Sequence, residues 1–322
     1  MRAFFLAAAL LSAIGARAQD KAEDTLAAVI GVQAKIQPSA RSVETLGTQR
    51  RGTGVLIRDG YVLTIGYLVI EAEAIHLTGA DGRTVPATVA AYDHASGFAL
   101  LRVVGTLNAK PLTLGDSSAL AEREPGLVIP AAAREASTLV HVVSRRPFSG
   151  SWEYMLDSAI FTYPPVADWS GAPLIGAKGE LLGIGSLIVP DAGAPGTQSP
   201  GNMFVPVDVL KPILEELIAD GRRRGPARPW LGVNAEEFRG HLFVSRVSSE
   251  GPAERAGLRA GDIVVAVAGE HVSTLAEFYR KIWGRGGAGV EVPIRVLQGA
   301  QLRELSVRSI DRVDYFRASK TY

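Results

Sequence analysis

The chain has 322 residues, of which 47% are hydrophobic and 21% are charged, and its formal net charge is +1. This composition excludes a disordered chain and is sufficient for two or three hydrophobic cores. The near-neutral charge gives no electrostatic reason to expect nucleic-acid binding. Cysteine is absent, which excludes disulfides, a cysteine nucleophile and thiolate metal sites. Five histidines without paired spacing give no metal-site signal.

The first 18 residues have the three parts of a secretory signal peptide. Arg2 is followed by the apolar run FFLAAALL at residues 4–11 and by the small-residue segment ARA at 16–18. We expect cleavage before Gln19. The apolar run is shorter than the roughly 20 residues that a membrane span needs, so an uncleaved anchor is the alternative. Removing the two arginines of this segment changes the formal charge from +1 to −1.

Residues 28–206 alternate short runs of Val, Ile and Leu with Gly, Asp and Pro turns. Such closely spaced strands indicate a β-barrel or a sandwich. Asp59-Gly60 and Lys178-Gly179 are each typical of a tight turn between two strands. The region is therefore predicted to be mostly β.

The pattern changes at residues 207–220, where apolar residues recur at helical spacing and Pro212 falls in the first turns, so a connecting helix is predicted. The segment GRRRGPARP at 221–229 is predicted to be a solvated linker, and the alternative is that its arginines hold an acidic partner. A compact mixed unit follows from residue 230 to 310, with strands near 243–244, 263–265 and 292–296 and a helix at 275–283. The last residues, 311–322, are predicted to form a loose tail.

Several motifs, in this order and spacing, resemble those of the HtrA/Deg family. They are GTGVLI at 52–57, GYVLT at 60–64, ALLRV at 99–103, LGDS at 114–117, DWSGAPL at 168–174 and NMFVPV at 202–207. The resemblance implies an exported, periplasmic protein whose fold is a trypsin-like double β-barrel over 19–220, followed after the linker by one α+β PDZ domain over 230–310.

The resemblance places Ser170 at the nucleophile position of the protease, but two partner positions are altered. The family's Thr-Asn-x-His-Val-Val stretch falls on residues 64–69, so Tyr67 stands where the catalytic His would be. Gly97 stands where the catalytic Asp would be. A phenol with a pKa of about 10 is a poor general base at neutral pH, and glycine can orient nothing. Asp168 replaces a glycine of the oxyanion loop, where a carboxylate would repel the developing negative charge.

One histidine is a candidate for a replacement base. His94 lies just upstream of Gly97, in a segment expected to approach the site, although a solvated loop histidine is the simpler interpretation. Ser170 likewise has a structural interpretation, because the tight turn before Gly171 needs a small residue.

The most specific resemblance lies in the C-terminal unit. WLGV at 230–233 resembles the carboxylate-binding loop of PDZ domains, and GPAERAGLRAGDIV at 251–264 resembles their central signature. The resemblance implies that Leu231, Gly232 and Val233 lie along the peptide-binding edge. Tyr279 and Ile282 are expected to face the groove, although their spacing also suits a core-facing stripe. A PDZ fold whose groove is blocked remains an open alternative.

The leading hypothesis is an exported pseudoprotease that binds peptide C-termini or unfolded segments in envelope protein quality control. The first alternative is an active serine endopeptidase that degrades misfolded exported proteins. A third possibility is a structural subunit that forms an oligomer with copies of itself or with a related protease. No cofactor or metal is expected.

Overall fold

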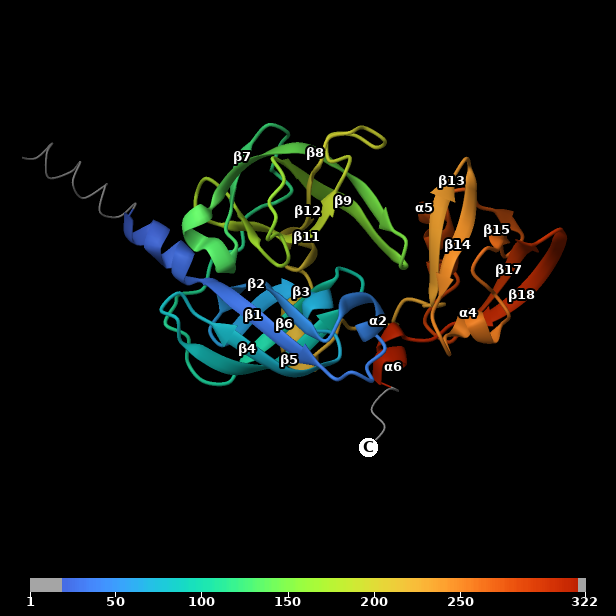
Figure 1. The fold of residues 1–322 in the computed structure, drawn as a ribbon, viewed down its shortest axis with the longest axis horizontal. Helices are drawn as coiled ribbons and strands as arrows, with labels where there is room; N and C mark the ends of the chain where they lie inside the picture. The colour runs from blue at the N-terminus through green and yellow to red at the C-terminus, as the bar shows by residue number, and fades with distance from the viewer. Residues whose placement is uncertain (1–18, 318–322) are drawn as a thin grey trace, which may run out of the picture.

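The computed structural model describes residues 19–317. The predicted signal peptide at 1–18 and the last residues of the predicted tail, 318–322, lie outside this range. The described part begins with a helix over residues 19–27 and then forms three β-rich units in chain order (Figure 1). Within it, no helix has both the length and the apolar composition of a membrane span.

The first unit is a closed six-stranded barrel. Its strands are β1 (Val29–Ile36), β2 (Gln49–Arg58), β3 (Tyr61–Ile65), β4 (Ala72–Thr78), β5 (Thr84–Asp93) and β6 (Phe98–Val103), in the order β1-β2-β3-β6-β5-β4. The short helix α2 (Val43–Leu46) and the 3-10 turn η1 (Gly66–Leu68) lie between these strands in the chain. The predicted turn at Asp59-Gly60 joins β2 to β3, with Gly60 at a φ of 77°.

The second unit is another closed barrel. Its strands are β7 (Pro125–Val128), β8 (Thr138–Gly150), β9 (Tyr154–Tyr163), β10 (Pro173–Ile175), β11 (Leu181–Val189) and β12 (Gly201–Pro206), in the order β10-β11-β12-β9-β8-β7, and η2 (Ala131–Ala136) lies between β7 and β8. One buried apolar cluster includes residues of both barrels. The double β-barrel predicted by the resemblance is confirmed.

The third unit is a sheet with its own buried core. It contains β13 (Val233–Phe238), β14 (His241–Val247), β15 (Ile263–Val267), β16 (Glu270–His271), β17 (Glu291–Gln298) and β18 (Gln301–Arg308), with helices α4 (Pro252–Arg255) and α5 (Leu275–Trp283). Helix α5 spans the predicted residues and begins with a capping box between Thr274 and Glu277. Strand β18 was not predicted, because nearly all of its residues are exposed and it lacks apolar alternation.

The connection between the second and third units differs from the predicted single helix. It forms η3 (Val207–Val209) and then α3 (Leu214–Asp220), with the turn around Pro212 between them. Proline has no N–H to donate, so it interrupts a helix that would continue through it. In the linker that follows, Arg223 pairs with Asp93 at 2.9 Å, and the Arg228 guanidinium lies 4.3 Å from the centre of the Trp283 ring. These two linker arginines have partners within the chain.

The described part of the segment after Ile310 differs from the predicted loose tail. It forms helix α6 (Arg312–Arg317), and the Arg41 guanidinium of the first unit lies 4.2 Å from the centre of the Tyr315 ring of this helix. The Tyr315 hydroxyl donates to Ser249 O at 2.9 Å, and the Tyr315 ring lies 4.6 Å from that of Trp230. The six-residue helix is too short to show an apolar period, so the sequence does not predict it. Its aromatic contacts hold it in place.

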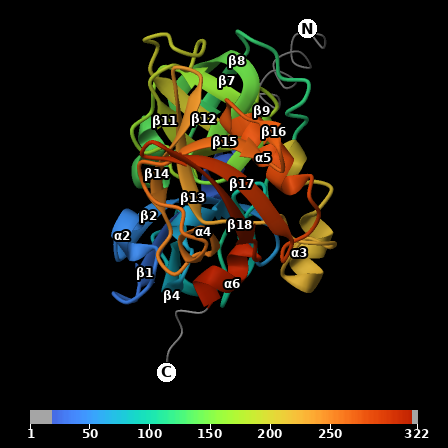
Figure 2. The ribbon, with the colours of Figure 1, turned by 90° about the vertical axis from the view of Figure 1, so that its right-hand side faces the viewer.

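The hairpin formed by β8 and β9 reaches from the second barrel to the third unit (Figure 1). Figure 2 shows the third unit in front of both barrels, with β13 and α4 near their junction. Gly150 pairs with Tyr154 at the end of this hairpin, so residues 151–153 form its tip. This tip contacts the third unit directly.

Candidate functional sites

The turn that carries Ser170 is fixed against the first barrel. Thr53 N donates to Ser170 O at 2.9 Å. Gly171 has a φ of 73°, and a Cβ atom there would lie 1.9 Å from Thr53 O. Only glycine fits such a close approach of two backbones. The tight serine turn expected from the sequence is therefore present, and it depends on Gly171.

Tyr67 lies in η1, and its hydroxyl points to the second barrel. The hydroxyl donates to Ser186 O at 2.9 Å, and Trp169 Nε1 donates to the same oxygen at 3.2 Å. Burial raises the pKa of Tyr67 to about 12, although the neighbouring Ser170 and Trp169 oppose that shift. The phenol is thus protonated at neutral pH, and it donates its hydrogen bond to Ser186 O. Arg50 holds this turn by donating to Tyr67 O at 2.9 Å.

The Ser170 hydroxyl has no hydrogen-bond partner among the described residues, although its oxygen is buried. A serine nucleophile needs a base within hydrogen-bond reach to take its proton. The exposed carboxylate of Asp168 lies two residues away in the same loop. The serine is therefore held in the turn without an activating contact.

The position of the expected catalytic Asp lies against a tyrosine. Gly97 has a φ of 80°, and a Cβ atom there would lie 3.3 Å from the Tyr154 hydroxyl. That hydroxyl donates to Ser96 O at 2.7 Å, and burial raises the pKa of Tyr154. A side chain at position 97 would therefore meet both an unfavourable backbone angle and the Tyr154 ring.

His94 does not form the hydrogen bond that a replacement base would need. Its ring lies 4.2 Å from that of Tyr92 and 6.1 Å from that of Phe316, measured between centroids. Burial, with a contribution from the Arg312 guanidinium, holds the pKa of His94 well below its usual value. A neutral imidazole with so low a pKa is a weak general base near pH 7.

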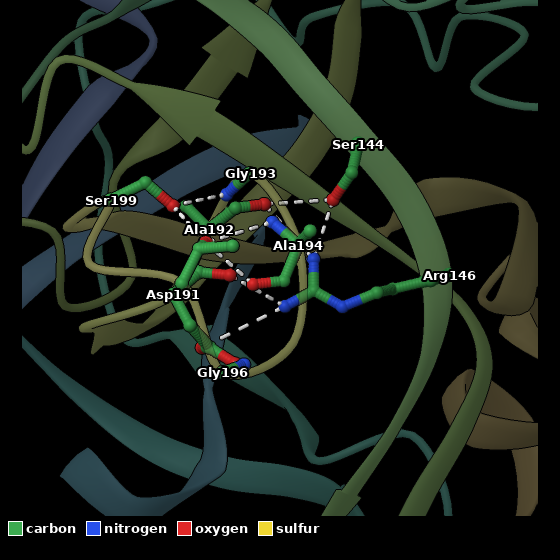
Figure 3. Close-up of polar contacts among 9 residues, drawn as sticks. Ser144, Arg146, Asp191, Ala192, Gly193, Ala194, Gly196 and Ser199 are labelled. Atoms are coloured by element: carbon green, nitrogen blue, oxygen red, sulfur yellow. Dashed lines mark hydrogen bonds and ion pairs between the residues drawn. The ribbon is translucent and has the colours of Figure 1, made fainter.

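A second polar network holds the loop that follows Ser186 in the chain. The Arg146 guanidinium donates to Ala192 O and Asp191 O at 2.9 Å each (Figure 3). It also lies 3.7 Å from the centre of the Phe161 ring. Ser144 Oγ donates to Ala192 O at 2.8 Å. These contacts anchor the β11–β12 loop to strand β8.

The loop expected to bind a carboxylate does bind one, and this carboxylate belongs to the same chain. Glu153, at the tip of the β8–β9 hairpin, accepts hydrogen bonds from Leu231 N at 3.0 Å, Gly232 N at 2.7 Å and Val233 N at 2.9 Å. The Glu153 residue is 5% exposed. Burial raises the pKa of its carboxyl, while the backbone donors and the Arg312 guanidinium oppose that shift.

The two candidate groove residues on α5 differ in their contacts. The Tyr279 hydroxyl donates to Gly150 O at 2.6 Å and accepts from Glu153 N at 3.1 Å. Ile282 is fully buried in the core of the third unit. Both residues are fully buried in the core of the third unit, and Tyr279 also reaches the hairpin tip through its hydroxyl.

The serine turn and the carboxylate-binding loop line one cavity of about 1170 Å³. Its lining includes Tyr67, Ser170, Tyr154, Gly232 and Val233. No group of three or more potential metal ligands occurs in the described part of the chain.

Sequence reasoning missed three residues of these sites: Glu153, Tyr154 and Arg312. Glu153 lies 78 residues before Leu231, in a hairpin tip that has no motif of its own. A strand-turn-strand pattern could have found the hairpin, but nothing in it indicates that its tip contacts another domain. Arg312 donates to Trp152 O at 3.2 Å from the segment that was expected to be loose.

Two domain models match the chain: a trypsin-like peptidase domain over residues 52–184 and a PDZ domain over residues 243–296. Similar curated proteins include a probable periplasmic serine endoprotease DegP-like of Halomonas elongata, 29% identical over 280 residues that cover 80% of this chain and 55% of the relative. A probable periplasmic serine protease do/HhoA-like of Haemophilus influenzae is 28% identical, covering 80% and 57%. The chain spans about half the length of the curated relatives it matches.

Solved structures with the same fold include the HtrA-type protease AlgW with a decapeptide, at 21% identity and a TM-score of 0.55, covering 91% of this chain and 98% of that one. The serine endoprotease from Yersinia pestis is 22% identical with a TM-score of 0.52, covering 91% and 97%. These likenesses show the fold of the two barrels followed by the third unit.

Proposed function

Since the chain has a trypsin-like peptidase domain followed by one PDZ domain, we propose that it is an HtrA-type pseudoprotease that binds peptides through its PDZ domain. The ligands are C-terminal or unfolded segments of exported proteins. The peptidase domain acts as the scaffold that carries the binding domain. The periplasmic names of its relatives support a role in envelope protein quality control.

The single observation that carries this proposal is that no base contacts the Ser170 hydroxyl. Its hydroxyl is buried without a hydrogen-bond partner among the described residues, while the Tyr67 hydroxyl donates to Ser186 O. Loss of one triad member costs roughly four orders of magnitude or more in rate. Here the positions of both partners are altered, and the space at Gly97 is taken by Tyr154.

Carboxylate recognition by the PDZ loop supports the binding half of the proposal. Three consecutive backbone N–H groups, those of residues 231–233, converge on one carboxylate. A peptide that adds to a sheet edge presents its terminal carboxylate to backbone N–H groups of this kind. The loop therefore has the donor set that a peptide C-terminus needs.

Hydrolysis of unfolded casein by the purified chain tests the proposal, with Ser170→Ala as the matched control. We expect equal, background rates from both proteins. Activity that is present in the unmodified chain and lost in Ser170→Ala would overturn the pseudoprotease proposal.

The second candidate function is serine endopeptidase activity. It is favoured by the retained Ser170-Gly171 turn, with Gly171 at a φ of 73°, and by the protease names of the relatives. The same assay decides between the two, because an active endopeptidase must lose its activity when the Ser170 hydroxyl is removed.

A further inference from the structure

We infer that the tip of the β8–β9 hairpin is a built-in ligand of the PDZ groove, with Glu153 in the place of a peptide's terminal carboxylate, so that an incoming C-terminal peptide must displace it. This inference rests on the proposed peptide-binding function and concerns the regulation of the same site.

The backbone contacts of the tip follow the pattern of an added peptide. The Glu153 carboxylate meets the loop at Val233 N, and two residues further along β13, Ala235 N donates to Ser151 O at 3.0 Å. The numbering rises along β13 while it falls along the tip, so the two segments run antiparallel. Addition of an extended segment to a sheet edge, with a carboxylate at its end, is the recognition mode of a C-terminal peptide.

The carboxylate is a side chain, so the main chain must turn away from the loop and return along β9. Glu153 has a φ of 56°, in the left-handed region that non-glycine residues avoid. Such a conformation persists only where its surroundings hold it. Here the Glu153 carboxylate bonds to the loop, and the Tyr279 hydroxyl accepts from Glu153 N at 3.1 Å. Both contacts come from the PDZ domain, which indicates that the turn is shaped to fit this groove.

Occupation of the groove satisfies the same groups that a ligand would use. Leu231, Gly232 and Val233 are all buried, and the bound carboxylate satisfies their three N–H groups. A second carboxylate cannot occupy the same position. The apparent dissociation constant for an external peptide therefore rises by the inverse of the fraction of molecules in which the tip is undocked.

The hairpin tip also borders the cavity that holds Ser170. Trp152 and Tyr154 flank Glu153, their rings stack with centroids 5.9 Å apart, and both line this cavity. The Tyr154 hydroxyl donates to Ser96 O at 2.7 Å, next to Gly97. One hairpin therefore contacts both the PDZ loop and the wall of the cavity beside the serine turn.

Two measurements test the inference, on the unmodified chain and on Glu153→Ala, Glu153→Gln and the control Glu304→Ala. Glu304 lies on β18 with its side chain 51% exposed, paired with Arg295. Hydrogen exchange over residues 230–236 reports whether the loop and the Ala235 amide are occupied. Fluorescence anisotropy reports binding of a labelled decapeptide pool with randomised last four residues, made with either a free or an amidated C-terminus.

We expect Glu153→Ala to lose amide protection at 231–235 and to bind the free-carboxyl pool at least about tenfold more tightly than the unmodified chain. The amidated pool gains nothing, Glu304→Ala behaves as the unmodified chain, and Glu153→Gln, which keeps the side-chain size, changes less but in the same direction. If both Glu153 variants keep the amide protection and the peptide affinity of the unmodified chain, the built-in ligand is overturned, whether that affinity is high or low. Protection that is lost while neither pool binds any variant would support the built-in ligand and overturn the proposed peptide-binding function.

Discussion

The serine turn and the PDZ loop line the same cavity but differ in how their polar groups are used. Ser170 Oγ is buried without a partner among the described residues, and the nearby Tyr67 hydroxyl donates elsewhere. In the loop, three backbone N–H groups share one carboxylate. Buried polar groups are normally hydrogen-bonded, so a set of buried groups that all have partners indicates an interaction that the fold maintains. Recognition of a carboxylate is therefore built into this fold, whereas activation of the serine is not.

The largest effect on stability is expected from removing the carboxylate that the loop holds. Glu153→Ala leaves three buried N–H groups without their acceptor, which should lower the free energy of unfolding by about 1–3 kcal/mol. Urea denaturation measures this change. Glu304→Ala, an exposed and paired glutamate, should stay within about 0.5 kcal/mol of the unmodified chain. Equal stabilities for the two variants would show that the loop does not depend on Glu153.

The second prediction concerns the closed position at Gly97. Gly97→Asp, which restores the residue type of the catalytic triad, places a side chain at a φ of 80° and against Tyr154. The cost should be about 1–2 kcal/mol of stability. The double variant Tyr67→His with Gly97→Asp should therefore remain without casein hydrolysis. Recovery of hydrolysis in that variant would mean that Tyr154 does not block the site.

The third prediction sharpens the role of the hairpin tip. Tyr279→Phe removes the hydroxyl that bonds to both Gly150 O and Glu153 N, which should cost about 1 kcal/mol of stability. Tyr163→Phe is the matched control, because Tyr163 is 53% exposed on strand β9. Hydrogen exchange at the Glu153 amide should rise in the Tyr279 variant alone, and the same rise in both variants would contradict the contact.

The smallest effect is a pH dependence from His94. Its folded-state pKa is depressed, mainly by burial, whereas the unfolded chain titrates near ~6.5. The folded state thus binds fewer protons than the unfolded chain. The contribution of His94 to the free energy of unfolding is therefore present above about pH 6.5. It is lost as pH falls toward the depressed pKa, at up to ~1.4 kcal/mol per pH unit. The urea midpoints of the unmodified chain and of His94→Gln should differ less at pH 5.5 than at pH 7.5. Parallel curves would contradict this.

The sequence predicted the fold because the signals that mark it are local. The double barrel followed from the order of short motifs, and helix α5 followed from its apolar spacing at 275–283. The contacts of Glu153 and Arg312 could not be predicted, because they join segments far apart in the chain and depend on how the domains pack. Helix α6 is too short for a periodic signal, and its position depends on Tyr315 packing against Trp230.

The roles of Ser170, Tyr67 and Gly97 could be anticipated only in part. Their identities predicted a triad without its base and its acid. The sequence could not show that Tyr67 donates to Ser186 O or that Tyr154 closes the space at Gly97. Both contacts are made across the chain by groups that carry no motif, so only the packed structure reveals them.

The most direct test of the central claim is the reactivity of Ser170 itself. A fluorophosphonate labels a serine hydroxyl that a positioned base has activated, and intact-protein mass spectrometry measures the adduct on the unmodified chain and on Ser170→Ala. We predict that neither protein is labelled above background. A single adduct on the unmodified chain that disappears in Ser170→Ala would contradict the claim and show that the serine is activated.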